Sequence, residues 1–233
     1  MPVITQFPEV DFRRPQPFRP PGTAGDILDV ATAEVDNGRQ IVVREICRTL
    51  GLTPGAPYSH FHSATQIDNL VVFNGLLELA GHLASAVVGM SEPRERLVAV
   101  CHAYREWALQ HPSRFAYIFP PGGREIEPSV SERVIDASRA MAVPGASAMA
   151  DGWAQGMFVS PGPGPAVEVL SIPGIVELDV DQSRVANAIW AAVHGALVME
   201  MAIGVHDGWD ARRGVFDWHV TAQIVAHLER PRN

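Results

Sequence analysis

The chain has 233 residues, of which 47% are hydrophobic and 19% charged, and its net charge is −8 at pH 7. This is the composition of a soluble globular protein, long enough for one domain or two small ones. The negative charge excludes a surface coated in positive charge, so any contact with nucleic acid requires a local patch of arginines. Two cysteines, Cys47 and Cys101, are too few for a disulfide framework or a zinc site.

The sequence predicts neither export nor a membrane span. The first 25 residues lack a positively charged start followed by an apolar run, so we expect no secretory signal and a cytoplasmic protein. The most apolar stretch, residues 189–205, contains His194 and Glu200 and is short for a bilayer. A buried helix is the expectation there.

The N-terminal third begins with a proline-rich segment. Residues 1–23 contain six prolines and predict a flexible arm, which carries the arginines Arg13, Arg14 and Arg19. From residue 24 onward, apolar residues recur with helical spacing until Asn37-Gly38, a pair that ends helices. A second short helix is expected over residues 43–50, stopped by Gly51.

The next stretch, residues 53–63, places two prolines where a helix is expected to begin. Thr53 is a suitable N-cap and Pro54 a suitable first residue, but Pro57 then falls within the first turn. The alternative is a looser, partly 3₁₀ first turn with regular helix starting near Ala56. Ser63 is expected to cap a long helix that ends near residue 88.

The remaining chain also has helical periodicity, and no strand pattern competes with it. We expect a break at Pro144-Gly145 and a long loop over residues 160–173. The predicted helices cover residues 97–109, 113–119, 130–141, 146–158, 183–205 and 215–229. The predicted fold is therefore all-α.

Residues 38–61 resemble the DNA-binding domain of the TetR family of bacterial transcriptional regulators. Residues 104–112 resemble the fifth helix of many members. Trp190 to Gly195 resembles the Trp-x-x-x-His-Gly signature of one subgroup, whose members often carry Ala-Pro-Tyr, as at residues 56–58. The matching stretches read Gly38, Val42-Val43-Arg44, Ile46-Cys47, Leu50-Gly51-Leu52-Thr53, Gly55-Ala56 and Tyr58-Ser59-His60-Phe61.

This resemblance implies a helix-turn-helix domain over residues 24–70 and a ligand-binding and dimerisation domain over residues 71–233. The second helix of such a motif lies in the major groove of DNA. For Tyr58 and Arg44 we favour DNA contact over packing and a solvated charge, and for Phe61 we favour packing. The residues implied to bind DNA are Arg44, Thr53, Pro54, Gly55, Ala56, Tyr58, Ser59 and His60.

Some positions depart from the family pattern. Val42 replaces the usual Ser or Thr cap, Ser59 replaces a larger polar residue, and Ala64 replaces the usual lysine. Residues 24–70 hold three arginines against six acidic residues, a balance of −3. DNA binding could therefore be weak or lost, or could rely on Arg13 and Arg14 in a neighbouring groove.

The C-terminal domain offers candidates for an effector pocket. Its aromatic and methionine side chains have two interpretations, an ordinary core or the lining of a pocket between helices. The candidates are Trp107, Phe115, Phe119, Met141, Met149, Trp153, Met157, Trp190 and His194. No catalytic motif occurs, and the histidines fit surface or core positions better than metal sites, so we expect no enzyme, cofactor or metal.

Together these features predict a homodimeric one-component regulator. We expect a repressor that binds palindromic operator DNA and is released by a small apolar or amphipathic effector. The last two helices would pair with those of a second copy as a four-helix bundle. The alternative is a TetR-like dimer with weak or lost DNA binding that serves as a ligand-binding or interaction module.

Overall fold

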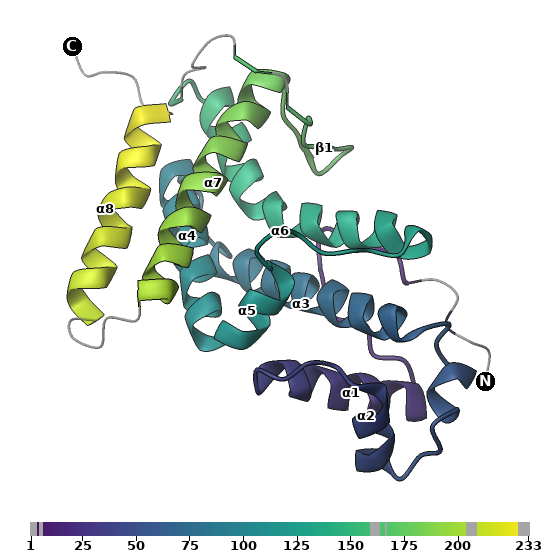
Figure 1. Ribbon diagram of the computed structural model, residues 1–233. Coiled ribbons are helices and arrows are strands. Elements are labelled where there is room, and N and C mark those ends of the chain that lie inside the picture. The colour runs from purple at the N-terminus through teal and green to yellow at the C-terminus, as the bar shows by residue number, and fades with distance from the viewer. Residues whose placement is uncertain (1–3, 5–6, 159–163, 166, 204–208, 228–233) are drawn as a thin grey trace. The chain divides into compact units, whose positions relative to one another are not determined.

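The computed structural model describes residues 4, 7–158, 164–165, 167–203 and 209–227 (Figure 1). Most of these residues are helical, which confirms the predicted all-α fold. Their elements are α1 (Thr23–Asp36), α2 (Val43–Leu50), the 3₁₀ turn η1 (Ala56–Ser59), α3 (Ala64–Ala86), α4 (Pro93–Gln110), α5 (Pro112–Ile118), α6 (Pro128–Ala154), β1 (Ser171–Ile172), β2 (Val176–Glu177), α7 (Val180–Ile203) and α8 (Trp209–His227).

The chain divides into two compact units. Unit 1 combines Met1–Gly81 with Gln110–Met141, and unit 2 combines His82–Leu109 with Ala142–Asn233. The boundary between the two units does not coincide with the expected domain boundary at residue 70. Helix α3 continues past residue 70, and α5 contacts α1 within unit 1.

In unit 1 the first two helices form where the apolar spacing predicts them. Ile27 and Ala31 of α1 are completely buried, as is Ile46 of α2. The α1 helix ends at Asn37, whose side-chain amide donates to the carbonyl of Ala33 at 2.7 Å. The α2 helix ends at Gly51, whose φ of 64° is the left-handed geometry that glycine adopts without strain.

The long helix α3 begins with the predicted cap. The backbone N–H of Gln66 donates to the Ser63 hydroxyl at 2.9 Å, which satisfies one of the free donors of the first turn. The apolar residues of α3 are buried over several turns within unit 1, including Ile67, Leu70, Phe73 and Leu77. This helix is the core element of unit 1.

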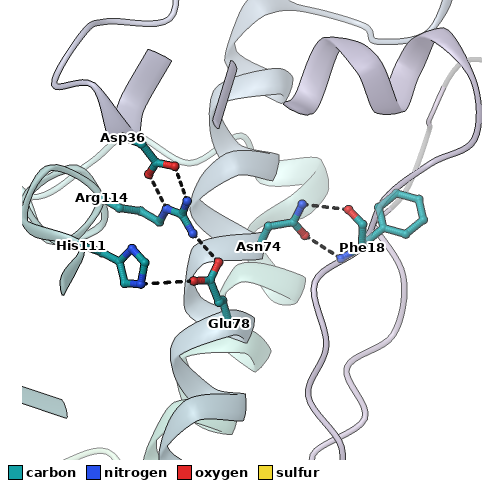
Figure 2. A network of polar contacts seen from close by, with 6 residues as sticks. All are labelled: Phe18, Asp36, Asn74, Glu78, His111 and Arg114. Atoms are coloured by element: carbon teal, nitrogen blue, oxygen red, sulfur yellow. Dashed lines mark hydrogen bonds and ion pairs between the residues drawn. The ribbon is translucent and has the colours of Figure 1, made fainter. Parts of the chain in front are cut away.

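The described part of the proline-rich segment is packed, so the prediction of a flexible arm is wrong for residues 7–22. Phe7 is 3% exposed and its ring lies 5.1 Å from that of Phe73. The side chain of Asn74 accepts from the Phe18 N–H and donates to the Phe18 carbonyl, both at 2.8 Å (Figure 2). Prolines prevent a helix here but leave an extended chain that can lie along α3.

In unit 2 the described parts are α4, the C-terminal part of α6, a hairpin, α7 and α8. The expected break at Pro144-Gly145 is absent, and α6 continues through Pro144. A Cβ added at Gly145 would lie 3.7 Å from the Val100 side chain and 3.9 Å from that of Leu97. Residue 145 therefore lies beside α4, and tertiary contact of this kind can offset the hydrogen bond that the proline removes.

The expected loop over residues 160–173 lies partly outside the described residues, and its last residues enter a short antiparallel hairpin. Ile172 pairs with Val176, and both side chains are buried. The α7 helix then starts earlier than predicted, because Asp179 and Gln182 form a capping box. The Gln182 N–H donates to Asp179 Oδ1 at 2.8 Å, and the Asp179 N–H donates to Gln182 Oε1 at 3.1 Å.

The apolar helix α7 is less buried than expected. A window within Val180–Ala202 is long and apolar enough to cross a bilayer, and only 22% of it is buried in the structure. Its inward face carries His194 and Glu200, which are hydrogen-bonded to residues of α4. The exposed side of the helix carries apolar residues such as Val198 and Met199.

Candidate nucleic-acid interface and effector-binding helices

The segment between α2 and α3, residues 53–60, forms an exposed turn that we call the wedge. Its helical part is the single 3₁₀ turn η1, so the expected regular helix near Ala56 is absent. Pro57 lacks the N–H that an α-helix capped at Thr53 would use, and the N–H groups of Ala56, Tyr58 and His60 bond to carbonyls three residues earlier. The Ala56 N–H donates to the Thr53 carbonyl at 3.0 Å, and the Tyr58 N–H to the Gly55 carbonyl at 3.2 Å.

The predicted N-cap role of Thr53 is also wrong. The residue that precedes η1 is Gly55, and no side-chain bond caps the turn. Thr53 contributes its backbone carbonyl and leaves its side chain exposed. The hydroxyl of Ser59 donates to the Ala56 carbonyl at 2.7 Å, so it closes the turn on itself.

Exposure separates the wedge residues into those that face solvent and those that pack. Tyr58 is 48% exposed, and the side chain of Arg44 on the preceding helix is 85% exposed. Pro57 and Phe61 are buried, which places Phe61 in the core as favoured above. The other predicted contacts are exposed or half-buried: Thr53, Pro54, Gly55 and Ser59 are exposed, and Ala56 and His60 are half-buried.

The acidic residues of the predicted helix-turn-helix domain are all paired with arginines. Three of these arginines, Arg19, Arg114 and Arg124, lie outside residues 24–70 in the sequence. The balance of −3 counted from the sequence therefore overstates the negative charge. The pairs are Asp26 and Asp29 with Arg19, Glu34 with Arg39, Asp36 with Arg114, Glu45 with Arg48, and Asp68 with Arg124.

Arg114 connects three helices of unit 1 (Figure 2). From α5, its Nε donates to Oδ1 of Asp36 at the end of α1, at 2.7 Å, and its Nη1 donates to Glu78 of α3. His111 lies 3.9 Å from the same Glu78 carboxylate. The guanidinium side chain is only 11% exposed, so these contacts link α1 to α3 through α5.

The candidate pocket residues do not fall in one compact unit. Phe115, Phe119 and Met141 belong to unit 1, where the two phenyl rings lie 5.1 Å apart. The other six belong to unit 2, and of these Met157 is 37% exposed. Trp107 and Met149 are each 2% exposed and are core residues.

In unit 2 a polar and aromatic cluster joins α4 to α7. The Tyr104 hydroxyl lies 2.6 Å from Nδ1 of His194, and the Tyr104 and Trp190 rings lie 4.8 Å apart. Burial lowers the pKa of His194 below its ordinary value. Trp190 and His194 were predicted site residues, whereas Tyr104 was missed, although it lies in the stretch that carries the family resemblance.

The C-terminal part of the chain matches a known family. A family model described as "Tetracyclin repressor-like, C-terminal domain" matches residues 97–223, more than half of the chain. The chain belongs to the TetR family. No curated protein sequence matches it significantly.

Solved structures of similar fold agree with this assignment. A protein with unknown function from Rhodococcus sp. RHA1 is 25% identical, with 89% of this chain and 94% of that one aligned at a TM-score of 0.64. The TetR-family regulator PfmR from Thermus thermophilus is 17% identical, and the alignment covers 88% of this chain and 97% of that one at a TM-score of 0.55. The ketosteroid transcriptional regulator KstR2 of Mycobacterium tuberculosis is 18% identical, and the alignment covers 94% of this chain and 100% of that one at a TM-score of 0.55. The last two identities are low and show the fold alone.

Membership of the TetR family makes this chain a transcriptional regulator of the helix-turn-helix class. The family model is described as repressor-like, and PfmR and KstR2 are described as transcriptional regulators. The family model matches the C-terminal region of the chain. The wedge, residues 53–60, lies outside this match, and its exposed position between α2 and α3 is consistent with a helix-turn-helix.

Proposed function

We propose that this TetR-family protein is a cytoplasmic repressor that binds palindromic operator DNA as a homodimer and is released by a small apolar or amphipathic effector. The observation that supports it most is the exposed wedge, with Tyr58 and Arg44 directed to solvent. Solvent-exposed aromatic and basic side chains next to a tight turn suit contact with phosphates and base edges.

The chemistry of the wedge fits a major groove. Gly55 and Ala56 leave little side-chain volume at its start, so the backbone can approach the bases closely. The Tyr58 hydroxyl can donate to a phosphate, and Arg44 can neutralise one. Because the acidic side chains near the wedge are paired with arginines, they repel DNA phosphates less than the charge balance of −3 over residues 24–70 suggests.

A second copy of the chain is proposed to cover the exposed faces of α7 and α8. On α7, Val198 is 41% and Met199 58% exposed, and on α8, Val215 is 65% and Trp218 68% exposed. Small residues Ala188, Ala191 and Gly195 precede the first pair on α7 and allow close helix packing. Burial of these faces against their symmetry mates would give a four-helix bundle.

The effector is proposed to bind among the helices of unit 2. The cluster of Tyr104, Trp190 and His194 combines aromatic surface with polar atoms, which suits an amphipathic molecule. Such an effector would act by preferring the dimer conformation whose two wedges do not match successive major grooves, about 34 Å apart. Release of DNA then follows from the difference in affinity between the two conformations.

The alternative, a dimer that no longer reads DNA, is supported by Ala64. This residue is exposed at the first position of α3, where the family resemblance leads us to expect a lysine. Arg44 also lies 3.7 Å from the Glu45 carboxylate, which reduces its attraction for phosphate. This alternative predicts binding of ligand without binding of DNA.

A gel-shift series with the DNA upstream of the protein's own gene separates the two functions. The repressor proposal predicts retardation that weakens steeply with salt, and about tenfold weaker binding for Arg44→Ala near 0.1 M salt. Arg139→Ala removes the same charge from α6 and serves as the matched control, with unchanged affinity expected. Absence of salt-sensitive retardation for the wild-type protein would favour the alternative.

A further inference from the structure

We infer that the N-terminal segment braces the wedge from behind and that Gln66 is a positioning residue for DNA binding. The inference rests on the proposed function of the wedge and names what fixes its orientation. The backbone N–H of Ile4 donates to the His60 carbonyl at 2.6 Å. The side-chain amide of Gln66 donates to the Ile4 carbonyl, also at 2.6 Å.

The side chain of Gln66 on α3 makes hydrogen bonds to two other backbone segments. Besides the bond from its Nε2 to Ile4, its Oε1 accepts from the His62 N–H at 2.7 Å. Its own N–H donates to Ser63 at 2.9 Å. The residue is 1% exposed, so its amide is shielded from water and each lost bond leaves a buried polar group unsatisfied.

The wedge needs such support because it has little structure of its own. Its helical part is one 3₁₀ turn, and Pro54 and Pro57 have no N–H groups to donate. Phe61 fixes the exit of the turn in the core. The bond from Ile4 to the His60 carbonyl adds a second fixed point at the end of the wedge, and Gln66 holds Ile4 in place.

The segment that follows Ile4 is itself anchored. Phe7 packs on Phe73, and Phe18 is bound through both backbone groups to Asn74. These contacts hold the segment on α3 at two further points. Ile4 therefore precedes a stretch of chain that is fixed to α3 at Phe7 and at Phe18.

The same path removes Arg13 and Arg14 from the neighbourhood of the wedge. Both N–H groups donate to Asp11 Oδ1, at 2.9 and 3.2 Å, in a turn just before Pro15. A Cβ on Gly81 would lie 3.1 Å from the Pro15 carbonyl, so this turn lies near Gly81. At 1.5 Å per residue, Gly81 is roughly 22 Å along α3 from Gln66. A role for these arginines in a groove next to the wedge is thereby disfavoured.

The first test isolates the Ile4 bond in the full-length protein without DNA. Ile4→Pro removes the donor N–H, whereas Ile4→Ala keeps it and serves as the control. Hydrogen exchange of the amides of Ala56, Tyr58, His60 and Phe61 is the readout. We expect exchange about fivefold or more faster in Ile4→Pro, and within about twofold of wild type in Ile4→Ala. Equal rates in Ile4→Pro and wild type would overturn the brace.

The second test asks whether the brace positions the wedge for DNA. Gln66→Met keeps the side-chain length but removes the donor and the acceptor, and Gln155→Met makes the same change at an exposed site of unit 2. We expect Gln66→Met to weaken operator binding about fivefold or more, with an unchanged salt slope because the number of phosphate contacts is unchanged. Gln155→Met is expected to bind like wild type.

The two readouts keep this inference separate from the proposed function. If the wild-type protein binds no DNA, the repressor proposal fails, and the exchange rates still decide whether the brace exists. If exchange accelerates in Ile4→Pro and Gln66→Met while operator affinity is unchanged, Gln66 is a structural residue only and the inference is wrong. A fall in salt slope in Gln66→Met would also contradict it.

Discussion

Arg105 on α4 and Glu200 on α7 form a buried, two-pronged ion pair. Nε of Arg105 lies 2.9 Å from Oε2 of Glu200, and Nη2 lies 2.5 Å from Oε1. The two side chains are 5% and 8% exposed, and the guanidinium lies 5.5 Å from the centre of the Phe216 ring on α8. The pair thus fixes α4, α7 and α8 relative to one another within unit 2.

Replacing Arg105 with leucine should destabilise unit 2 strongly. The change leaves the Glu200 carboxylate buried without its partner, and we expect a loss of about 3–5 kcal/mol in the free energy of unfolding. Tryptophan fluorescence in a urea titration measures this, because all five tryptophans belong to unit 2. The double variant Arg105→Leu/Glu200→Leu should recover most of the loss, since it buries no unpaired charge.

An exposed ion pair provides the matched control. In unit 1, Arg48→Leu breaks the shorter of the two ion pairs of Glu45 at a site where the arginine side chain is 77% exposed, and circular dichroism follows its unfolding. Its effect on unfolding should stay within about 0.5 kcal/mol. If Arg105→Leu proved as mild as this control, the description of the Arg105–Glu200 pair as buried and essential would be wrong.

The stability of unit 2 should fall as the pH is lowered through the titration of His194. Burial lowers the folded-state pKa of His194 below its ordinary value of 6.5, so the unfolded chain binds the proton more readily. Unfolding free energy should therefore decrease from about pH 6.5 down to the folded pKa and then level off. His194→Gln should remove this component from urea titrations at a series of pH values.

The exposed His62 provides the comparison for this pH dependence. His62→Gln should leave the pH profile of unit 2 as in the wild-type protein. A wild-type profile that stays flat across the same pH range, or one that His194→Gln does not change, would contradict the assignment to His194.

Arg114 should contribute to the stability of unit 1 through its two carboxylate partners. Arg114→Met breaks the contacts to Asp36 and Glu78, and we expect a loss of about 1–2 kcal/mol, because both carboxylates remain partly solvated. Arg114→Lys keeps the charge but not the forked geometry and should lose less. Hydrogen exchange of α1 and α5 amides reports on this unit, and unchanged rates in Arg114→Met would refute the link.

Ala64→Lys should strengthen DNA binding. Ala64 is exposed at the start of α3, and a lysine there could add one phosphate contact. The expected gain is roughly tenfold near 0.1 M salt, with a steeper dependence of affinity on salt. Fluorescence anisotropy measures both, with Ala154→Lys at an exposed position of α6 as the control. An equal gain in the control would show that charge alone, not position, is responsible.

Trp218→Asp should prevent dimerisation. The side chain is 68% exposed in the single chain, and the proposed bundle would bury it, so a carboxylate there would be desolvated without a partner. Sedimentation equilibrium should report a monomer, and Val88→Asp, at an 80% exposed position in a turn, should remain a dimer. A dimeric Trp218→Asp protein would place the interface elsewhere.

Much of the fold followed from local patterns in the sequence. The apolar spacing of α1 and α2, the Gly51 stop and the Ser63 cap predicted the start of unit 1 closely, because each depends on residues a few positions apart. The Asp179–Gln182 capping box was equally local and could have been recognised. The exposed positions of Tyr58 and Arg44 also agree with the expectation, although their contact with DNA stays a prediction.

Other features depend on contacts that sequence spacing does not reveal. Asn74 and Gln66 are polar residues in an apolar helix, and their partners Phe18 and Ile4 lie 56 and 62 positions away. The partner atoms are backbone N–H and carbonyl groups, which nearly every residue type has, so the amino-acid sequence does not reveal them. The helix α6 also continues through Pro144, beside α4, although propensity alone predicts a break.

In the proposed complex two wedges, held by a dimer, enter successive major grooves of the operator. A footprint of the wild-type protein on its upstream DNA, read at single-nucleotide resolution, tests this most directly. We expect two protected half-sites related by a twofold axis, with centres about 34 Å apart, and we expect Arg44→Ala to need about tenfold more protein for the same protection near 0.1 M salt. Absence of protection, or protection of a single half-site by a monomer, would contradict it.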